Sequence, residues 1–550
     1  MRFPRTPRRR RGFPLAVCAA LCIALAAAGC GGGGGTKTAA LVKIGTSSTI
    51  DTVNPFTALQ LLPNQLFDQE YPFLFYHDHT GHLKGDFATD WTISNQFKTI
   101  RITVHSGGKW SDGQPLTAKD AAWMLNTVVR LKAGPGANFD GYMPTLKSAS
   151  APNDTTLVVQ LSAPTTVALG QLASIPILPE HVWAKYAKGD GKALTTFQNP
   201  APHVGGGPFY LAKYTPKQIA IFNVNPGYYG PKPHVKRLGF TLYSSTDAMV
   251  QGIKNGEVDA INGAPYASLP ALRKAGVHID NPDAFDSLWL TINDSSKPTQ
   301  HPELHNLKVR EAIDMAVDRE RIVRTAMFGS AEPGAAVMPP ANLNLHLDAP
   351  PTPFDLDQAN TILDGLGYKK GSDGIRVANG HKMSYKVILL QDPGGPEQTT
   401  LEIMKNDLRQ IGIQINVTPL DATAALAALE GPKKDYSTFD MFMLSFIGNY
   451  LPSGTLPVFR CNALGAYNYS GTCSKEFDAL DDKATAATDE ATAQKYTLDE
   501  QRWVMEHRPL LVIAYLKDIY AYRDPWTGFV AGPQGWFYGT HETAVSVAQK

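Results

Sequence analysis

The segment over residues 99–129 constrains the fold of this chain most strongly, because it predicts a strand, a turn and a helix in succession. Residues 99–105 alternate between polar and apolar side chains, which is the period of a half-buried strand. A turn follows at Ser-Asp-Gly, residues 111–113, where glycine can adopt the positive φ that turns often need. Thr117 and Asp120 then stand three residues apart, as in a capping box, ahead of apolar residues at helical spacing. This part of the chain is therefore expected to combine strands with helices.

The length and charge of the chain narrow its architecture and its partners. A chain of 550 residues is too long for one compact core, since single cores stop growing at about 250 to 300 residues. At least two lobes are therefore expected. From Cys30 onward the chain carries 45 Lys and Arg against 50 Asp and Glu, a net charge of −5. Because no stripe of Lys and Arg follows residue 29, we expect no nucleic-acid partner.

The N-terminus has the features of an export signal. Six arginines lie within residues 1–11, and the apolar stretch over 13–28 is shorter than the roughly 20 residues of a membrane span. Ala-Ala-Gly-Cys over 27–30 is similar to a bacterial lipobox, in which Cys30 is lipidated and becomes the mature N-terminus. Glycines 31–35 would then form a flexible tether. The alternative is a signal that is cleaved to release the protein, and either the Sec or the twin-arginine route fits the arginines.

The cysteines agree with an exported protein. Cys18 and Cys22 would leave with the signal, so Cys461 and Cys473 are the two thiols left in the mature domain besides Cys30. In an oxidising compartment they are expected to pair, and the short loop they close would add roughly 3 kcal/mol on the chain-entropy model. A metal site is the alternative, but two cysteines with no histidine between them are poor zinc ligands.

Four segments, in order along the chain, resemble the family 5 solute-binding proteins, which are the extracytoplasmic receptors of peptide and nickel ABC transporters. One is Trp110 with the turn after it and the sequence PLTAKD that leads into the helix, and the others lie at 71–91 before it and at 205–261 and 288–323 after it. The resemblance extends over about residues 41–530. The resemblance implies a receptor that would capture a solute and deliver it to a membrane permease.

The resemblance implies an α/β, two-lobed fold like that of periplasmic binding proteins, of type II and the large peptide-binding class, with an extra subdomain in the first lobe. Two crossing segments, near Asp286 and His507, would form the hinge between the lobes. The expected parts are a signal peptide over 1–29, the lipidated cysteine and Gly-rich linker over 30–40, the core of lobe I over 41–65, 203–286 and 508–550, its extra subdomain over 66–202, and lobe II over 287–507.

Local patterns predict several elements outside the first segment. A strand is expected over 209–214, and a helix capped by Thr246 is expected to end at Gly256. After Asp478 a helical pattern runs to about His507, and 510–515 is expected to be a strand that returns to the first lobe.

The ligand cleft is placed by the resemblance. The first strand, over 41–45, is followed by a loop whose hydroxyls could donate hydrogen bonds to a ligand. The residues expected to line the cleft are Ser47, Ser48, Thr49, Tyr71, Phe285, Phe446, Asn449, Tyr450, Tyr467 and Asn468.

One of these residues departs from the family pattern. The resemblance implies a carboxylate in the second lobe that pairs with the free amine of a peptide, three residues after an aromatic side chain, and these positions hold Phe446 and Asn449. A buried ammonium without a counter-ion is costly, so Asn449 argues against a ligand with a free α-amine. If the alignment is shifted, Asp440 or Asp421 takes this role.

The leading hypothesis is a receptor for a peptide-like or other polar organic solute, in which an ABC permease and the membrane, reached through the N-terminal lipid, are the partners. We expect a monomer with no cofactor and no enzymatic activity, lipid-anchored outside the cytoplasm. A receptor for a sugar or a nickel chelate is the alternative. A different class would be an exported metal-dependent hydrolase using His77, His79 and His82, which have the spacing H-x-H-x-x-H.

Overall fold

The structure is a computed structural model that describes residues 41–295, 301–390, 395–430 and 436–550. The predicted signal peptide, the Gly-rich linker and the predicted lipidation site at Cys30 lie outside the described residues. Within those described, no helix is both long and apolar enough to cross a membrane.

The strand, turn and helix predicted over 99–129 are confirmed. Ile100, Ile102 and Val104 are buried along β5 (Thr99–Val104), and their polar neighbours face outward. The capping box of α2 (Ala118–Leu131) forms as predicted: the Thr117 side chain accepts from Lys119 N–H, and Asp120 accepts from Thr117 N–H.

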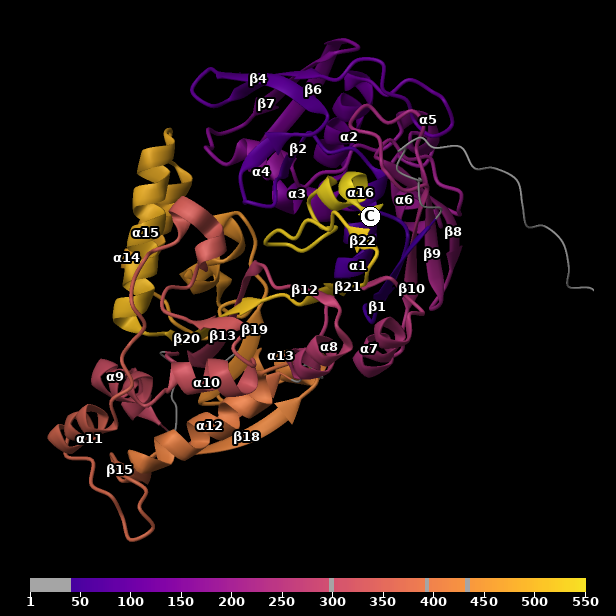
Figure 1. Cartoon of the computed structure of the whole chain (residues 1–550). Helices are drawn as coiled ribbons and strands as arrows, with labels where there is room; N and C mark the ends of the chain where they lie inside the picture. Colours follow the sequence, from indigo (N-terminus) through magenta and orange to yellow (C-terminus); the bar gives the residue numbers. More distant parts are fainter. Residues whose placement is uncertain (1–40, 296–300, 391–394, 431–435) are drawn as a thin grey trace, which may run out of the picture. The chain divides into compact units, whose positions relative to one another are not determined.

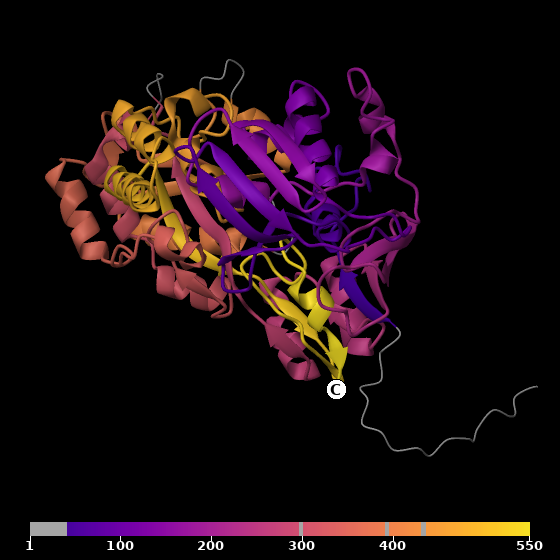
Figure 2. The ribbon, with the colours of Figure 1, turned by 90° about the horizontal axis from the view of Figure 1, so that it is seen from above.

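Strand β5 belongs to a four-stranded antiparallel sheet in the order β4-β5-β7-β6. Its other strands are β4 (Ala88–Ser94), β6 (Leu146–Asn153) and β7 (Thr156–Leu161). Figure 2 shows them side by side, in indigo to violet. Helix α2 packs on β6 and β7, and the apolar residues of the helix and the sheet form one core.

A seven-stranded sheet has the order β12-β21-β11-β1-β10-β9-β8. Its strands are β1 (Val42–Thr46), β8 (Phe209–Thr215), β9 (Ile219–Val224), β10 (Arg237–Leu242), β11 (Ala260–Ile261), β12 (His278–Asp280) and β21 (Tyr520–Tyr522). β1 runs parallel to both of its neighbours, β10 and β11. The beginning, middle and end of the described chain therefore meet in one sheet. We call the elements around the seven- and four-stranded sheets the first lobe.

A six-stranded sheet, in the order β14-β20-β13-β19-β17-β18, organises what we call the second lobe. Its strands are β13 (Asp283–Ile292), β14 (Ala331–Pro333), β17 (Ser384–Leu390), β18 (Gln414–Leu420), β19 (Met441–Phe446) and β20 (Leu510–Lys517). Its helices include α9 (Leu307–Met315), α10 (Arg319–Ala326), α11 (Leu356–Gly365) and α12 (Glu397–Gln410), of which α12 packs on β18 and β19 (Figure 1).

The chain crosses between these two sheets twice, and one crossing differs from the prediction. The first crossing lies between β12 and β13, at residues 281–282. The strand predicted over 510–515 forms, but it pairs with β13 and β14 in the second lobe instead of returning to the first. Leu510 to Leu516 are all buried, as expected for an inner strand. The second crossing is therefore at 518–519, and the boundary at 507 is wrong for this strand.

Two predicted helices also differ in detail. Helix α7 (Thr246–Asn255) ends at Gly256 as predicted, but Ser245 is its N-cap and accepts from Ala248 N–H. The long helix expected after Asp478 is a pair, α14 (Lys475–Thr485) and α15 (Glu490–His507), which pack side by side (Figure 1). Asp489 caps the second helix and so ends the continuity of the pattern.

The other elements are shorter. The remaining helices are α1 (Leu61–Glu70), α3 (Ala137–Tyr142), α4 (Ala168–Leu172), α5 (Glu180–Trp183), α6 (Lys192–Thr196), α8 (Leu269–Ala275), α13 (Ala422–Glu430) and α16 (Glu542–Ser546). Three two-stranded sheets pair β2 (Phe75–His77) with β3 (Leu83–Gly85), β15 (Val377–Ala378) with β16 (His381–Lys382), and β22 (Trp526–Thr527) with β23 (Ala548–Gln549).

Candidate functional site

A cavity of about 490 Å³ is lined by segments of both lobes. The first lobe contributes residues from the loop before α1, from α1, β2 and α3, and from the segment 534–539. The second lobe contributes residues 449–454, which follow β19. We call this space the interlobe cavity. Because its walls come from both lobes, a solute held in it would contact both.

Helix α1 brings a carboxyl group to this cavity. Leu62 and Leu66 of the helix are buried in the core of the seven-stranded sheet, whereas Phe67 joins the core of the four-stranded sheet. Asn64 and Asp68, four residues apart and therefore on one face of the helix, line the cavity. The packing of the apolar residues thus fixes the direction of the polar pair.

The Asp68 carboxyl is largely buried, and its two oxygens differ in their contacts with the described residues. Its side chain is about 5% exposed, and Oδ2 accepts a hydrogen bond of 2.8 Å from Gly539 N–H. No described residue forms a hydrogen bond with Oδ1. Burial raises the pKa of Asp68 to about 7, against a smaller lowering by the Gly539 bond and by His541. The group therefore titrates near neutral pH.

Behind Asp68 lies a second buried carboxyl, Asp86, which is well satisfied. Its Oδ2 accepts from Phe73 N–H at 2.8 Å, and its Oδ1 accepts from the Tyr229 hydroxyl at 2.7 Å. His541 Nδ1 lies 3.4 Å from Asp86 Oδ1. Burial acts to lower the pKa of His541, but Asp86 and, less strongly, Asp68 raise it overall. The two carboxyls therefore favour the protonated form of the imidazole.

The second lobe faces the cavity with an aromatic ring. Tyr450 stacks on His77 of β2, with ring centroids 3.6 Å apart and an interplanar angle of 11°, and Phe285 meets the same tyrosine edge to face at 4.4 Å. Burial lowers the pKa of His77 to about 4, so the imidazole of this contact is neutral at physiological pH. Gly170 permits the neighbouring approach of Leu451, because a Cβ at that position would lie 2.9 Å from Leu451 Cδ2.

Asn449 lines the cavity, and its side chain is engaged locally. Its Oδ1 accepts from Leu451 N–H at 2.8 Å, and its main-chain carbonyl accepts from Asn342 Nδ2 at 2.9 Å. The side chain therefore shapes the turn at 449–451. Of the acids considered for its role, Asp440 accepts from Lys386 N–H and does not line the cavity, and Asp421 accepts from Ala424 N–H, also outside it.

The other residues predicted to line the cleft are spread over several surroundings. Ser47, Ser48 and Thr49 follow β1 but are not in the cavity wall. Tyr71 is buried at the end of α1, where its hydroxyl accepts from Asn199 Nδ2.

In the second lobe, Phe285 reaches the site through Tyr450, whereas Phe446 stacks on Trp289 with centroids 3.9 Å apart. Tyr467 is 69% exposed. Asn468 is buried, and its amide donates to the carbonyls of Arg460 and Thr472. The structure thus brings Phe285, Asn449 and Tyr450 together.

The three histidines considered for a hydrolase point to different partners. His77 stacks on Tyr450, His79 contacts Glu542 with Nδ1 3.2 Å from Oε2, and His82 Nδ1 lies 2.8 Å from the Thr80 hydroxyl. A search of the described residues for three or more His, Cys, Asp or Glu that could hold a metal ion finds no such group.

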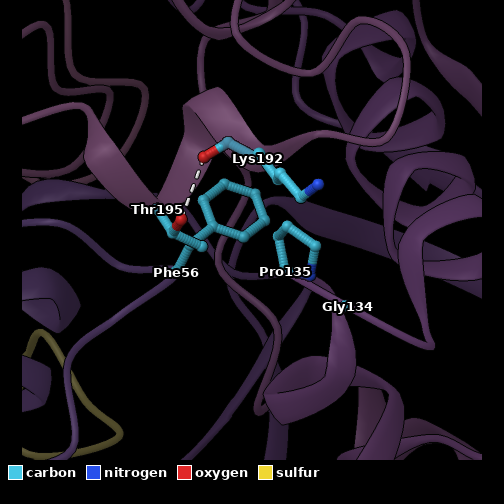
Figure 3. A pocket seen from close by; sticks show the side chains of 5 residues that line it. All are labelled: Phe56, Gly134, Pro135, Lys192 and Thr195. Carbon is cyan, nitrogen blue, oxygen red and sulfur yellow. Dashed lines mark hydrogen bonds between the residues drawn. The ribbon is translucent and has the colours of Figure 1, made fainter.

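A second hollow, of about 300 Å³, belongs to the first lobe alone. Figure 3 shows its lining by Phe56, Gly134, Pro135, Lys192 and Thr195, with the Thr195 hydroxyl donating to the Lys192 carbonyl at 2.9 Å. No residue of the second lobe lines it, so a solute there would not join the two lobes.

The crossings between the lobes carry a pair of acids that sequence analysis placed only in part. Asp286 lies on β13, four residues after the first crossing, and Asp518 lies at the second, where it accepts from the Tyr520 hydroxyl at 2.7 Å. Burial raises the pKa of both carboxyls, and the charge of Asp518 raises that of Asp286 further. The pair therefore favours a state in which one carboxyl holds a proton.

Asp68 is the main residue of the cavity that sequence analysis missed. The spacing of Asn64 and Asp68 marks a polar face of α1, which is a signal present in the sequence. What the sequence lacks is the identity of the wall opposite, since residues 449–454 and 534–539 are distant along the chain.

Comparison with known proteins gives consistent matches over most of the chain. The sequence model described as bacterial extracellular solute-binding proteins, family 5 Middle, matches residues 82–461. A putative ABC transporter peptide-binding protein of Brucella ovis is 27% identical over 384 residues, covering 68% of this chain and 67% of that protein. A probable ABC transporter-binding protein of Deinococcus radiodurans is 26% identical over 535 residues, covering 88% of each.

Solved structures match the fold. The ABC transporter substrate-binding protein CtaP of Listeria monocytogenes superposes with a TM-score of 0.79 at 19% identity, over 93% of this chain and all of that one. NikA of Brucella suis, in complex with Fe(III)-EDTA, superposes with a TM-score of 0.78 at 18% identity, over 93% of this chain and all of that one. The oligopeptide-binding protein AppA of Bacillus subtilis, in complex with a nonapeptide, superposes with a TM-score of 0.72 at 19% identity, over 94% of this chain and all of that one. The predicted α/β, two-lobed binding-protein fold is confirmed.

Proposed function

This chain belongs to the bacterial extracellular solute-binding proteins of family 5, and we propose that it is the substrate-binding component of an ABC importer. In this role it captures a peptide-like or other polar organic solute between its two lobes and delivers it to a membrane permease. The observation that carries the proposal is the interlobe cavity of about 490 Å³, whose walls come from both lobes. The relatives described as peptide-binding proteins support the class of solute.

Capture follows from the placement of the cavity relative to the crossings. A solute that contacts residues 449–454 on one side and α1 on the other makes both sets of contacts only when the lobes are together. Such a solute stabilises that arrangement because it binds it better than any separated one. The permease would then recognise the joined lobes.

We place lobe I at 41–280 and 520–550, with its extra subdomain over 66–202, and lobe II at 283–517. The sheet membership of β13 and β20 supports these limits. We further propose that the N-terminal signal exports the protein, that a lipid at Cys30 anchors it to the membrane, and that it acts as a monomer. The Cys461–Cys473 disulfide in the structure, with sulfurs 2.08 Å apart, fits an extracytoplasmic location.

Thermal-shift measurements on the purified protein test the proposal. The panel comprises peptides, acetylated peptides, oligosaccharides and metal chelates, and native mass spectrometry identifies any ligand that copurifies. A solute present at 100 times its Kd should raise the unfolding free energy by about 2.7 kcal/mol. Absence of any stabilising solute would contradict the proposal.

A pair of tyrosine variants locates the binding. Tyr450→Ala removes the cavity ring that stacks on His77, so we expect it to weaken binding at least about tenfold, in line with an aromatic anchor. Tyr467→Ala removes the same side chain at a position 69% exposed and outside the cavity wall, and should leave binding unchanged. Equal effects of the two variants would place the solute elsewhere.

A further inference from the structure

We propose that Asp68 binds a protonated nitrogen of the captured solute, so that this receptor selects solutes carrying an amine or guanidinium cation. The inference rests on the proposed capture of a solute in the interlobe cavity and assigns the charge of that solute. In this proposal the carboxylate that pairs with the amine of the solute lies on α1 of the first lobe, whereas the family resemblance implied such a carboxylate at position 449 of the second lobe.

The first argument is the charge of the cavity wall. Asp68 is the one acid among the described residues that line the cavity, and none of those residues is Lys or Arg. The lining histidine, His77, is held neutral by burial, which lowers its pKa to about 4. An anionic group in this space would therefore meet a carboxylate and no counter-charge, whereas a cation would meet an opposite charge at short range.

The second argument is the state of the carboxyl itself. Asp68 is about 5% exposed and lines the cavity, and its carboxyl receives a single hydrogen bond from the described residues, from Gly539 N–H to Oδ2. Asp86 provides the contrast, since hydrogen bonds from Phe73 and Tyr229 reach both of its oxygens. Oδ1 of Asp68 is thus left for a donor that arrives with the solute, and an N–H of a cation gives the stronger, charge-assisted bond.

The third argument is what surrounds Asp68. Four titratable groups face it: Asp86 and His541 from behind, Tyr142 on α3, and Tyr538. Burial, with Asp68 adding to it, raises the pKa of both tyrosines, so they remain neutral phenols. Both rings line the cavity, and aromatic faces also attract cations. His541 Nδ1 lies 3.4 Å from Asp86 Oδ1, and His541 also lowers the pKa of Asp68, although less than the Gly539 hydrogen bond does.

This arrangement changes what Asn449 implies. The absence of a charge at 449 argued against a free amine on the assumption that the second lobe supplies the counter-ion. Asn449 and Asp68 line the same cavity from opposite lobes, and the asparagine side chain is engaged by Leu451 N–H. A carboxylate is therefore present in the site, on the other wall.

Three tripeptide probes that share one backbone test the charge preference by calorimetry at pH 7.5: trialanine amide, a cation; N-acetyl-trialanine amide, which is neutral; and N-acetyl-trialanine, an anion. We expect the cation to bind wild type on the order of 10- to 100-fold more tightly than the neutral probe. Asp68→Asn should reduce this ratio to within about threefold, and Asp68→Glu should restore part of it. Asp140→Asn, which removes a charge from α3 at a position outside the cavity wall, should retain it.

Binding of the cation should also depend on pH through Asp68. Because burial raises the pKa of this carboxyl to about 7, a proton must leave it before a cation can bind. The affinity of wild type for trialanine amide should fall on the order of 50- to 100-fold between pH 7.5 and 5, with proton release visible as a dependence of the binding heat on the buffer. Asp68→Asn, which has no carboxyl to protonate, should lose most of this pH dependence.

The outcomes separate the inference from the function beneath it. A neutral or anionic probe that binds wild type as tightly as the cation overturns the role of Asp68 and leaves capture in the cavity standing. Retention of the cation preference in Asp68→Asn, with circular dichroism confirming a folded variant, overturns it as well. If neither these probes nor a wider panel of amines, sugars and chelates of any charge binds wild type, the proposed capture fails, and the inference fails with it.

Discussion

Replacing Asp68 by asparagine should stabilise the ligand-free protein at pH 8 while weakening its binding of cations. The pKa of this carboxyl is raised from 3.8 to about 7 in the folded protein, a difference that corresponds to about 4 kcal/mol of unfavourable free energy when the group is fully ionised. Asparagine has nearly the same shape and can still accept the hydrogen bond from Gly539 N–H, but it carries no charge to bury.

The sign of the pH dependence follows from where the proton is held. Between pH 7 and pH 4 the folded protein keeps Asp68 protonated while the unfolded chain has it ionised, so the folded state binds more protons. The unfolding free energy of wild type therefore rises as pH falls through 7, by about 3 kcal/mol between pH 8 and pH 5 from this one group. The Asp68→Asn variant lacks that contribution.

Urea denaturation of both proteins at pH 8 and pH 5 measures the difference. The unfolding free energy of Asp68→Asn should exceed that of wild type most at pH 8, and the difference should be about 3 kcal/mol smaller at pH 5. Asp140→Asn is the control for removing one negative charge from the same lobe, and should not reproduce the pattern. If Asp68→Asn destabilises the protein equally at both values of pH, the carboxyl is not paying a burial cost, and the reasoning from its pKa is refuted.

Three further predictions concern other parts of the chain. Replacing Cys461 and Cys473 by serine should lower the unfolding free energy by roughly 3 kcal/mol, because the unfolded chain gains the freedom of the open loop; urea denaturation measures it, and an unchanged midpoint would contradict the estimate. Asp286→Asn should raise the melting temperature more at pH 8 than at pH 5, since burial and Asp518 raise the pKa of the carboxyl that it removes. A lower melting temperature of the variant at both pH values would contradict this and would mean that the charge is needed near the crossing. Cys30→Ser should shift the protein from the membrane fraction to the medium or periplasm, and unchanged membrane association would refute lipid anchoring at this residue.

The secondary structure was predictable where local rules decide it. The alternation along β5 depends on six consecutive residues and the capping box of α2 on two residues three positions apart, and both form as the sequence indicates. The exceptions are also local: Ser245 takes the cap assigned to its neighbour, and Asp489 starts a new helix inside what reads as one pattern. In both cases the side chain that reaches a free backbone N–H decides the boundary.

Sheet membership was harder, because it depends on long-range pairing. The strand over 510–517 is apolar throughout, which predicts a buried strand without saying in which sheet it is buried. Its partners, β13 and β14, lie about 180 to 230 residues earlier in the chain. A resemblance to a family predicts the order of the elements along the chain, but only the structure shows which sheet this strand joins and with which partners it pairs.

The candidate site was predictable only on the side that the family resemblance describes. Asn449 and Tyr450 were expected at the ligand, and both line the cavity, whereas Asn468 holds a loop together through its amide. Asp68 has no motif, since an acid on a mostly buried helix is equally consistent with a structural ion pair. Its significance depends on the absence of a second hydrogen bond in a particular space, which is a property of the folded chain.

The two walls of the cavity offer a solute different kinds of contact, and this difference explains why the fold alone does not identify the solute. The second lobe presents Tyr450 and a turn closed by Asn449, which can pack against a solute of almost any kind. The first lobe presents a carboxyl whose pKa burial raises to about 7 and which accepts one hydrogen bond, from Gly539 N–H. For a solute bound there as proposed, contacts with the aromatic wall would be general, whereas those with the carboxyl would depend on charge, so the proposal assigns selectivity to the first lobe. If the captured solute carries the proposed cation and also contacts Tyr450 of the second lobe, its charge and the joining of the lobes would be coupled through one ligand.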